Sequence, residues 1–295
     1  MKREGSPVAR GGGRGGWSAA LGALLLACSG FDGGEDRAPL ESETVASLNP
    51  TDSLPPMASP ARGGASTGAD WSCLGAPPAS APTVPVTQDV GYSLPIRSLL
   101  GAPIANAFAK VCLPADLACA MPLSEVRGLA ADDVLALQVP RGFNGFVELT
   151  VDGHVPMVFE MRRPVWRDTV DTLPLQPIPT AGLLQLAGLL NTEIVPELGF
   201  VSVTVVDCKG DRAPGVVYNN NLGGRLFYFI DGVPSVSAPA TGFQGSGGFG
   251  NVPTRLVEIT ATLAADGREV GTKTVLPRAG WITVVEVYPP ALPLE

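Results

Sequence analysis

The chain has 295 residues, of which 36 are Gly and 29 are Pro, and its formal net charge is −8. Residues 1–27 hold four basic residues and one acid, a net +3, which leaves −11 for residues 28–295. An acidic chain with scattered Lys and Arg lacks a basic surface for a phosphate backbone, which excludes nucleic acid as a partner and disfavours attraction to an anionic membrane surface.

The N-terminal segment has the order of parts found in a secretory signal peptide. Basic residues come first, the stretch from Ser18 to Cys28 (SAALGALLLAC) is apolar, and the small Ala27 precedes Cys28. This stretch is too short for a membrane-spanning helix, which needs about 20 apolar residues. We therefore expect residues 1–27 to be a signal peptide that directs export.

The end of the apolar stretch resembles the lipobox of bacterial lipoproteins, with Leu25-Leu26-Ala27 directly before Cys28. In that family the cysteine thiol receives a diacylglycerol, the signal is cut before it, and the new amino group is acylated. The resemblance implies that Cys28 is the lipid attachment site of an envelope lipoprotein, held by several acyl chains. Ser29 is not a retention signal of the Asp type, which favours the outer membrane and leaves its face open. Ordinary secretion with a free Cys28 is the alternative.

Residues 28–70 are expected to form a disordered tether. Gly, Pro, Ser and acids dominate this segment, and no apolar periodicity recurs, so it cannot bury enough surface to offset its ordering entropy. Gly64 to Gly68 matches the G-x-S-x-G nucleophile pattern. That pattern requires a strand before it, a helix after it and a His as base, and the segment predicts none of these.

Four cysteines remain if Cys28 carries lipid: Cys73, Cys112, Cys119 and Cys208. An even number is typical of disulfides in an oxidising compartment. Of the three connectivities, we favour Cys112–Cys119, which closes the short loop CLPADLAC, together with Cys73–Cys208. The C-x6-C pair could instead bind metal, but the chain has a single His, which argues against zinc.

From residue 71 onward the sequence predicts antiparallel strands with one buried face. Apolar residues alternate with polar ones, and Gly, Pro, Asn and Asp separate the runs. The clearest alternating runs are Val147–Val151, Val201–Val205 and Val257–Leu263, and Trp281–Tyr288 is β-branched and apolar. Helical spacing is confined to Thr180–Asn191, where Thr180 is the expected N-cap.

Two halves of this region look related, which predicts the domain organisation. Each half has a strand, a Gly/Pro turn, a connection, a Val-Pro step at 139–140 or 252–253, and a further strand. Pro has no N–H, so it ends a strand at a sheet edge. We expect a mainly β fold with two small antiparallel β-sandwich domains, residues 71–173 and 197–295. The linker at 174–196 holds the short helix.

This order of parts resembles the carboxypeptidase regulatory-like domain, a small transthyretin-type β-sandwich. The resemblance covers residues 95–165 and 197–289, and its clearest motif is Phe249-Gly250-Asn251-Val252-Pro253. The layout is also similar to a group of envelope lipoproteins from high-GC bacteria. Their folded part begins with W-x-C-L, as at Trp71–Leu74, and their second half holds Asp-Cys-x-Gly, as at Asp207–Gly210. These resemblances imply a fold and an envelope location, and no chemistry.

The candidate binding surface is the aromatic-rich segment from Asn219 to Gly250, because long loops on β-scaffolds often carry function. Its candidate residues are Phe227, Tyr228, Phe229 and Phe243. The alternative is a solvent-exposed connection plus one core strand, Arg225–Ile230. Gly245 to Gly250 also matches G-x-G-x-x-G, but a dinucleotide site needs a helix after this pattern, and a strand is expected here.

The sequence contains no recognisable catalytic set. The single His, His154, follows Asp152-Gly153 and is expected at a hairpin turn. The carboxylates of Asp207, Asp211 and Asp132-Asp133 lack the spacing of a calcium loop. We therefore predict a protein that is not an enzyme and holds no metal or cofactor.

Three functions follow from this reading. The first is an envelope lipoprotein, attached to the membrane through its lipid, whose non-catalytic sandwiches bind a glycan or an envelope protein. The second is a purely structural surface spacer. The third is an accessory protein to an envelope hydrolase.

Overall fold

The computed structural model describes residues 68–80, 88–98, 104, 106–129, 133–171 and 173–292. The expected signal peptide, Cys28 and the tether up to residue 67 lie outside these ranges. In chain order the elements are β1 (Asp89–Pro95), β2 (Phe108–Cys112), β3 (Ser124–Arg127), β4 (Val134–Pro140), β5 (Phe146–Thr150), β6 (Met157–Glu160), β7 (Thr169–Val170), α1 (Thr180–Leu189), β8 (Gly199–Val205), β9 (Val216–Asn220), β10 (Arg225–Ile230), β11 (Val233–Ser235), β12 (Ser246–Val252), β13 (Val257–Leu263), β14 (Glu269–Val275) and β15 (Ile282–Val287). Within the described ranges, no helix has the length and apolar character needed to span a membrane.

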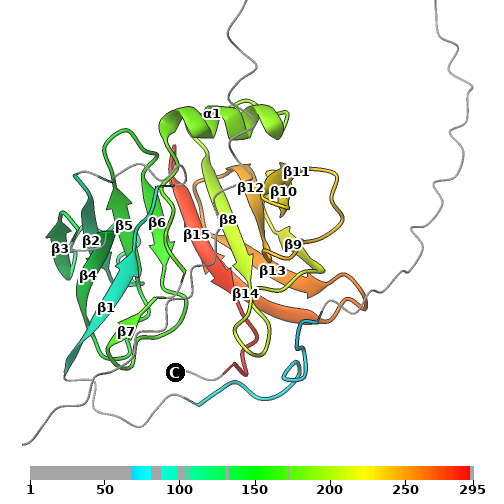
Figure 1. Cartoon of the computed structure of the whole chain (residues 1–295), viewed down its shortest axis with the longest axis horizontal. Coiled ribbons are helices and arrows are strands. Elements are labelled where there is room, and N and C mark those ends of the chain that lie inside the picture. The colour runs from blue at the N-terminus through cyan, green and yellow to red at the C-terminus, as the bar shows by residue number, and fades with distance from the viewer. Residues whose placement is uncertain are drawn as a thin grey trace, which may run out of the picture. The chain divides into compact units, whose positions relative to one another are not determined.

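The strands form three sheets (Figure 1). A nine-stranded sheet has the order β11-β10-β12-β8-β15-β6-β5-β2-β3, and two three-stranded sheets have the orders β4-β1-β7 and β14-β13-β9. Every second residue of β1, β4 and β13 is buried, the pattern of strands with one face on a core. The predicted mainly β fold of the sandwich class is confirmed.

Strand β15 joins the two halves of the chain within the nine-stranded sheet. It pairs in parallel with β8 of the second half and with β6 of the first half, so Ile282 lies opposite both Phe200 and Met157. The strand is rich in β-branched residues and buried on both faces, as a central parallel strand requires. The structure thus differs from two separate antiparallel sandwiches, because the two share one sheet and the described residues belong to one compact unit.

The two halves have their cores on opposite faces of the shared sheet. Met157, Phe200 and Ile282 are register neighbours and belong to the first core. Val201 and Val285 belong to the second core, and successive residues of a strand point to opposite faces. Because β1 and β4 contribute to the first core and β9 and β13 to the second, the two small sheets cover opposite faces of the large one.

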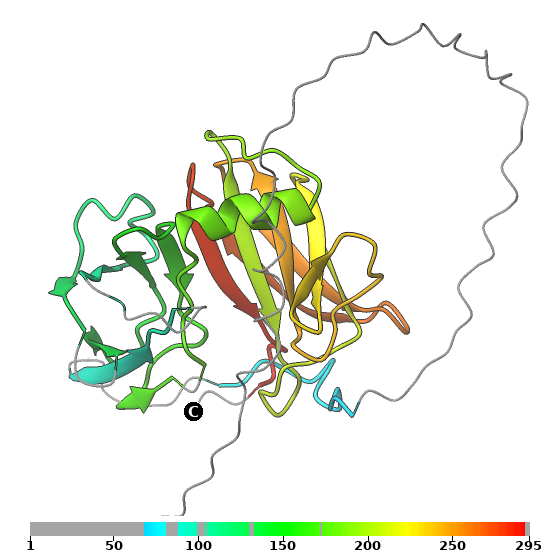
Figure 2. The same ribbon diagram turned by 45° about the horizontal axis from the view of Figure 1, so that its top comes forward.

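Helix α1 lies across one end of the nine-stranded sheet (Figure 2). Leu183 and Ala187 are its buried residues. The predicted helix is confirmed, but Thr180 is not its N-cap. The cap position is Pro179, which makes no side-chain hydrogen bond, because the Thr180 hydroxyl donates instead to the Gly153 carbonyl oxygen at 3.3 Å.

Candidate functional site

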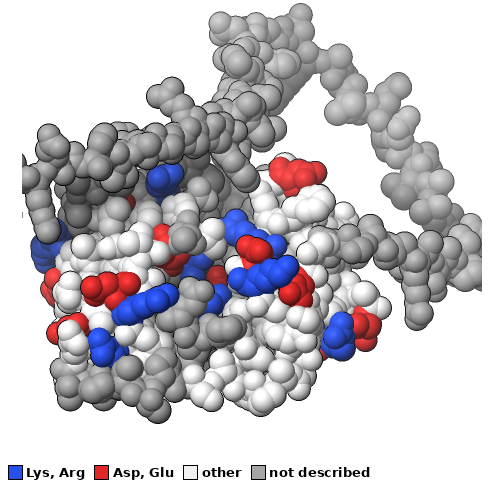
Figure 3. Space-filling view, turned by 60° about the horizontal axis from the view of Figure 1, so that its bottom comes forward, with Lys and Arg blue, Asp and Glu red and all other residues white. Residues whose placement is uncertain are grey.

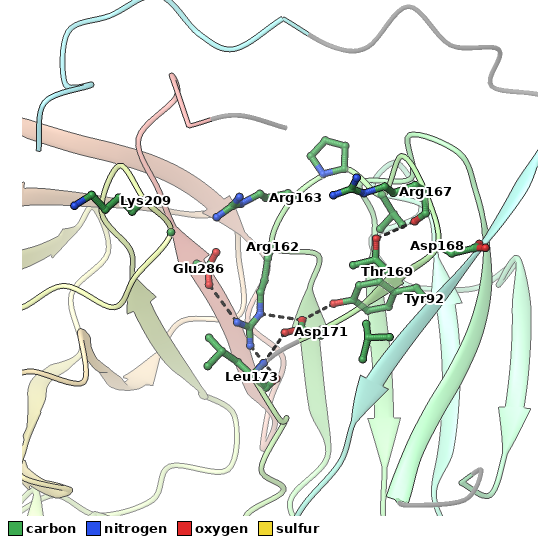
Figure 4. Close-up of a pocket in the computed structure, with 14 residues that line it drawn as sticks. Tyr92, Arg162, Arg163, Arg167, Asp168, Thr169, Asp171, Leu173, Lys209 and Glu286 are labelled. Carbon is green, nitrogen blue, oxygen red and sulfur yellow. Dashed lines mark hydrogen bonds and ion pairs between the residues drawn. The ribbon is translucent and has the colours of Figure 1, made fainter. Parts of the chain in front are cut away.

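An open cleft lies beside β15, where the two sandwiches meet. Its volume is about 620 Å³, and it is lined by Tyr92 of β1, by most of the segment 162–173, by Lys209 and Gly210 after β8, and by Glu286 of β15. Figure 3 shows Lys, Arg, Asp and Glu side chains gathered over the centre of the face that lies at the bottom of Figure 1. Figure 4 shows the charged residues of the cleft.

Arg162 is the centre of an ion-pair network on the floor of the cleft (Figure 4). Its Nε lies 3.2 Å from Asp171 Oδ2 and its Nη1 lies 3.3 Å from Glu286 Oε2. Its Nη2 also donates to the Leu173 carbonyl oxygen at 3.3 Å. Tyr92 donates its hydroxyl to Asp171 Oδ2 at 2.5 Å. The two carboxylate side chains are each 6% exposed, so Arg162 supplies the countercharge that their burial requires.

Burial controls the protonation of this network. Burial raises the pKa of Glu286, and the positive charge of Arg162 opposes that rise. Burial, and after it the charge of Asp171, raises the pKa of Tyr92 far above its usual range. Tyr92 therefore keeps its proton and acts as a hydrogen-bond donor. The groups on the floor of the cleft thus supply one another's hydrogen bonds and countercharges.

Three further cations line the cleft: Arg163, Arg167 and Lys209. Arg167 is exposed. The side chain of Lys209 is 64% exposed, and its Nζ lies 3.8 Å from Asp70 Oδ2, a distance and exposure at which an ion pair contributes little. With Arg162, these three make four cations among the described residues of the lining, against the three acids Asp168, Asp171 and Glu286, a net +1 on a chain whose formal net charge is −8. The cleft is therefore a locally positive site on an acidic protein.

The Cys73–Cys208 disulfide fixes the wall of the cleft that carries Lys209. The carboxylate of Asp207 accepts hydrogen bonds from the N–H groups of Lys209 at 2.8 Å and Asp211 at 3.1 Å. A third N–H, that of Asp70, donates to its other oxygen at 2.8 Å. Asp207 therefore organises a turn, and its oxygens are occupied by the backbone.

Both predicted disulfides are confirmed, Cys73–Cys208 and Cys112–Cys119. The sulfurs of the second lie within 4.8 Å of a Glu148 oxygen, a grouping of potential metal ligands. These two sulfurs are bonded to each other, and Glu148 is paired with Arg278. The three groups are therefore engaged in structural contacts.

The predicted aromatic surface is divided between the protein interior and the solvent. Phe227 is 3% exposed, and Tyr228 is 2% exposed and belongs to the second core. Phe229 is half-buried, whereas Phe243 is 80% exposed. The reason is that Arg225–Ile230 forms β10, whose successive residues point to two covered faces of the sheet. The core-strand alternative is the one observed, so Phe227 and Tyr228 are not surface residues.

His154 and the Gly-rich motif both lie in structural positions. His154 follows β5 in the tight connection to β6, as predicted, with its Nδ1 2.8 Å from the Asp152 carbonyl oxygen. The cleft lies beyond the other end of β6, and His154 does not line it. Ser246–Val252 forms β12, and β13 follows it, so the predicted strand replaces the helix that a dinucleotide site would need.

The sequence analysis did not predict the cleft. A signal was present, because Arg162, Arg163 and Arg167 fall within six positions of an acidic chain. Their partners come from distant strands, and Arg162 and Glu286 are 124 positions apart. Only the parallel pairing of β15 with β6 brings these two together.

No protein-family model matches the chain, and the search of curated proteins finds no significant match. Three solved structures are similar in part. The TIE protein of Bacillus anthracis is 12% identical over 68% of this chain and 34% of its own, with a TM-score of 0.22. A shaft pilin from Lactobacillus rhamnosus GG is 7% identical over 69% of this chain and 100% of its own, with a TM-score of 0.23. A streptococcal ancillary pilin is 11% identical over 68% of each chain, with a TM-score of 0.21.

The chain thus spans about a third of the length of the TIE protein structure. TM-scores of this size mark a partial likeness between β-rich structures, and nothing about the function of this chain follows from them.

Proposed function

We propose that the protein is a non-catalytic, lipid-anchored protein of the bacterial envelope that binds a partner in the cleft between its sandwiches. The observation that carries this proposal is the cleft itself, about 620 Å³ of open space over a floor of paired charges. Such a floor suits recognition, because preorganised groups need little ordering when a ligand binds. The sandwiches are proposed to be of the carboxypeptidase regulatory-like type, which the motif at Phe249–Pro253 supports.

The non-catalytic part of the proposal is supported by how the polar groups of the cleft are used. Glu286, whose pKa burial raises, is the first candidate for a general acid or base. Its Oε2 contacts Arg162, and Asp171 faces both Arg162 and the Tyr92 hydroxyl. A catalytic acid or base must instead reach the proton of a substrate.

The lipid anchor is supported by the N-terminal sequence, where Cys28 lies outside the described residues. We expect palmitate labelling of the wild-type protein in cells, and none after Cys28→Ser. The variant should also be released from the membranes, because residues 28–295 carry a formal net charge of −11, which anionic lipids repel. Full partition of the variant with the membranes would show that the anchor assignment is wrong.

Binding in the cleft is tested with the chain carrying Cys28→Ser, immobilised with both disulfides intact and exposed to an extract of the producing bacterium's envelope. Val170→Trp fills the mouth of the cleft, where Val170 is 67% exposed. The matched control is Val233→Trp, on edge strand β11 outside the cleft, where Val233 is 57% exposed. The proposal requires a partner that binds the parent chain and the control and is lost with Val170→Trp. If no envelope component is retained, or if all three forms retain the same components equally, the hypothesis of a structural spacer is favoured instead.

A further inference from the structure

Strand β7 presents to the cleft an edge that is paired with no other strand of the described residues. It is the outermost strand of the sheet β4-β1-β7, and Thr169 and Val170 line the cleft. It runs parallel to β1, with the Asp171 N–H donating to the Ser93 carbonyl oxygen at 2.8 Å. A residue that lies between two bonded positions of such a ladder turns its own peptide groups the other way. The N–H and C=O of Val170 therefore point away from β1.

Cations line the same cleft as this edge. Arg163, Arg167 and Lys209 line the cleft together with β7 (Figure 4). The two acids on the floor are already paired with Arg162. The third acid of the lining, Asp168, is exposed and accepts the Gly91 N–H at 2.7 Å. The cations outnumber it, so the charge that the cleft presents to an incoming ligand is positive, and anionic groups on that ligand would meet guanidinium and ammonium groups.

A sugar matches this lining less well than a peptide does. Sugar rings commonly stack their C–H groups on an exposed aromatic face, and the aromatic ring lining this cleft, Tyr92, is 4% exposed with its hydroxyl given to Asp171. A peptide in extended conformation supplies the N–H and C=O groups that would pair with those of Val170. Its side chains alternate in direction, so acidic ones can reach the cations.

We propose that the cleft binds an extended peptide segment rich in Asp or Glu. Its backbone pairs with Val170 at the edge of β7, and its carboxylates pair with Arg167 and Lys209. Strand addition of this kind obtains affinity from main-chain hydrogen bonds and specificity from the side chains. The ligand is an acidic segment of another envelope protein. The inference rests on the proposed function, since it names the ligand class of the same cleft.

The test measures fluorescence anisotropy of short labelled peptides with the chain carrying Cys28→Ser. The probe alternates Glu and Thr, and a second probe has the same sequence with every peptide nitrogen methylated, which keeps its charge and removes the backbone hydrogen-bond donors of both edges. A third probe replaces Glu by Lys, and a fourth ligand is a uronic acid oligomer. We expect the Glu/Thr peptide to bind and to weaken with added salt. The methylated peptide should bind at least about tenfold more weakly, and the Lys peptide should not bind.

Variants of the protein locate the binding. Arg167→Glu should weaken binding of the Glu/Thr peptide by about tenfold, whereas Arg255→Glu, an equal charge change at an exposed Arg outside the cleft, should leave it unchanged. Val170→Pro removes only the outward N–H, which an edge strand tolerates, and should also weaken binding. If Val170→Pro does not fold, Arg167→Glu and the methylated peptide still decide the matter.

Three results would overturn the inference: equal binding of the methylated peptide, tighter binding of the uronic acid oligomer, or no effect of Arg167→Glu. None of these results contradicts the proposed function. That proposal is wrong only if Val170→Trp abolishes the binding of no envelope partner. The two ideas can thus fail separately.

Discussion

The two sandwiches share one sheet, but different polar interactions and disulfides stabilise them. The first uses the ion pairs of Arg162 and the short-range Cys112–Cys119 disulfide, whose cysteines are 7 positions apart. The second uses the Cys73–Cys208 disulfide, whose cysteines are 135 positions apart, and the buried hydroxyls of Tyr218 and Tyr228. Charged groups thus border the cleft, and neutral polar groups occupy the closed core.

Desolvation explains this division. The Tyr218 hydroxyl is fully buried and donates to the Gly245 carbonyl oxygen at 2.8 Å, while the Tyr218 N–H donates to the Tyr228 hydroxyl at 3.0 Å. A neutral hydrogen-bonded group costs far less to bury than a charge does. Arg162, by contrast, has a side chain that is 19% exposed in the cleft, so its ion pairs lie where water still reaches one partner. The charged set should therefore depend on pH and on its countercharges, whereas the neutral set should not.

The largest effect is expected from the long-range disulfide. Replacing Cys73 and Cys208 together by Ala should lower the free energy of unfolding by up to about 5 kcal/mol, because the bridge closes a long loop in the unfolded chain. The same change at Cys112 and Cys119 should cost about 2.5 kcal/mol, since that loop is short. Urea denaturation of both variants measures the ratio. Equal losses would contradict loop closure as the main difference between the two bridges.

The next effect concerns the charged floor. Arg162→Met should lower the free energy of unfolding by about 3 kcal/mol, because it removes the cation that contacts both buried carboxylates. Arg255→Met, at an exposed position, should change it by less than about 0.5 kcal/mol. Adding Asp171→Asn and Glu286→Gln to Arg162→Met should recover part of the loss in urea denaturation. If the triple variant is less stable than Arg162→Met alone, the ionic description of the floor is wrong.

A smaller loss is expected from the neutral core. Tyr218→Phe removes the donor to the Gly245 carbonyl oxygen and should cost about 1 to 2 kcal/mol. The cost should be the same at pH 5 and pH 8, because burial raises the pKa of Tyr218 well above its ordinary value. Tyr288→Phe removes a half-buried hydroxyl that accepts from Lys273 Nζ at 3.2 Å and should cost less. Thermal unfolding of both variants at the two pH values measures these costs. A cost of Tyr218→Phe that changes with pH would contradict the contrast between a neutral core and a charged cleft.

Local features of this fold could be predicted from the sequence, and the shared sheet could not. Alternation at Val201–Val205 indicates a strand wherever that strand lies, and the four cysteines that follow Cys28 indicate disulfides. No local sequence pattern indicates that β15 lies between β8 and β6, so the Arg162–Glu286 ion pair could not be predicted. The aromatic run Phe227–Phe229 shows the same limit. A strand with both faces covered has no polar side, and its sequence alone does not separate it from an exposed aromatic patch.

The smallest effect is a pH dependence that belongs to the first sandwich. Burial raises the pKa of Glu160 on β6 to about 7 from 4.5, although the charges of Lys273 and Arg278 oppose the rise. The folded protein therefore holds this proton more tightly than the unfolded chain does. The resulting stability is fully present below about pH 4.5 and is lost as the pH rises through about 7.

We expect the Glu160 contribution to unfolding free energy to fall by about 1 to 2 kcal/mol over that interval. The full shift corresponds to roughly 3 kcal/mol, but Glu160 keeps contact with water, which reduces the effect. Burial also raises the pKa of Glu286, so both groups contribute to the pH dependence of the wild-type unfolding free energy. The Glu160→Gln variant removes the contribution of Glu160 alone. Glu160→Gln should flatten the pH dependence measured by urea denaturation, and Glu258→Gln, at an exposed position of β13, should leave it unchanged. An unaltered pH dependence in Glu160→Gln would mean that water and the charge of Lys273 keep the Glu160 carboxylate ionised. The pH dependence of stability would then come from the cleft alone.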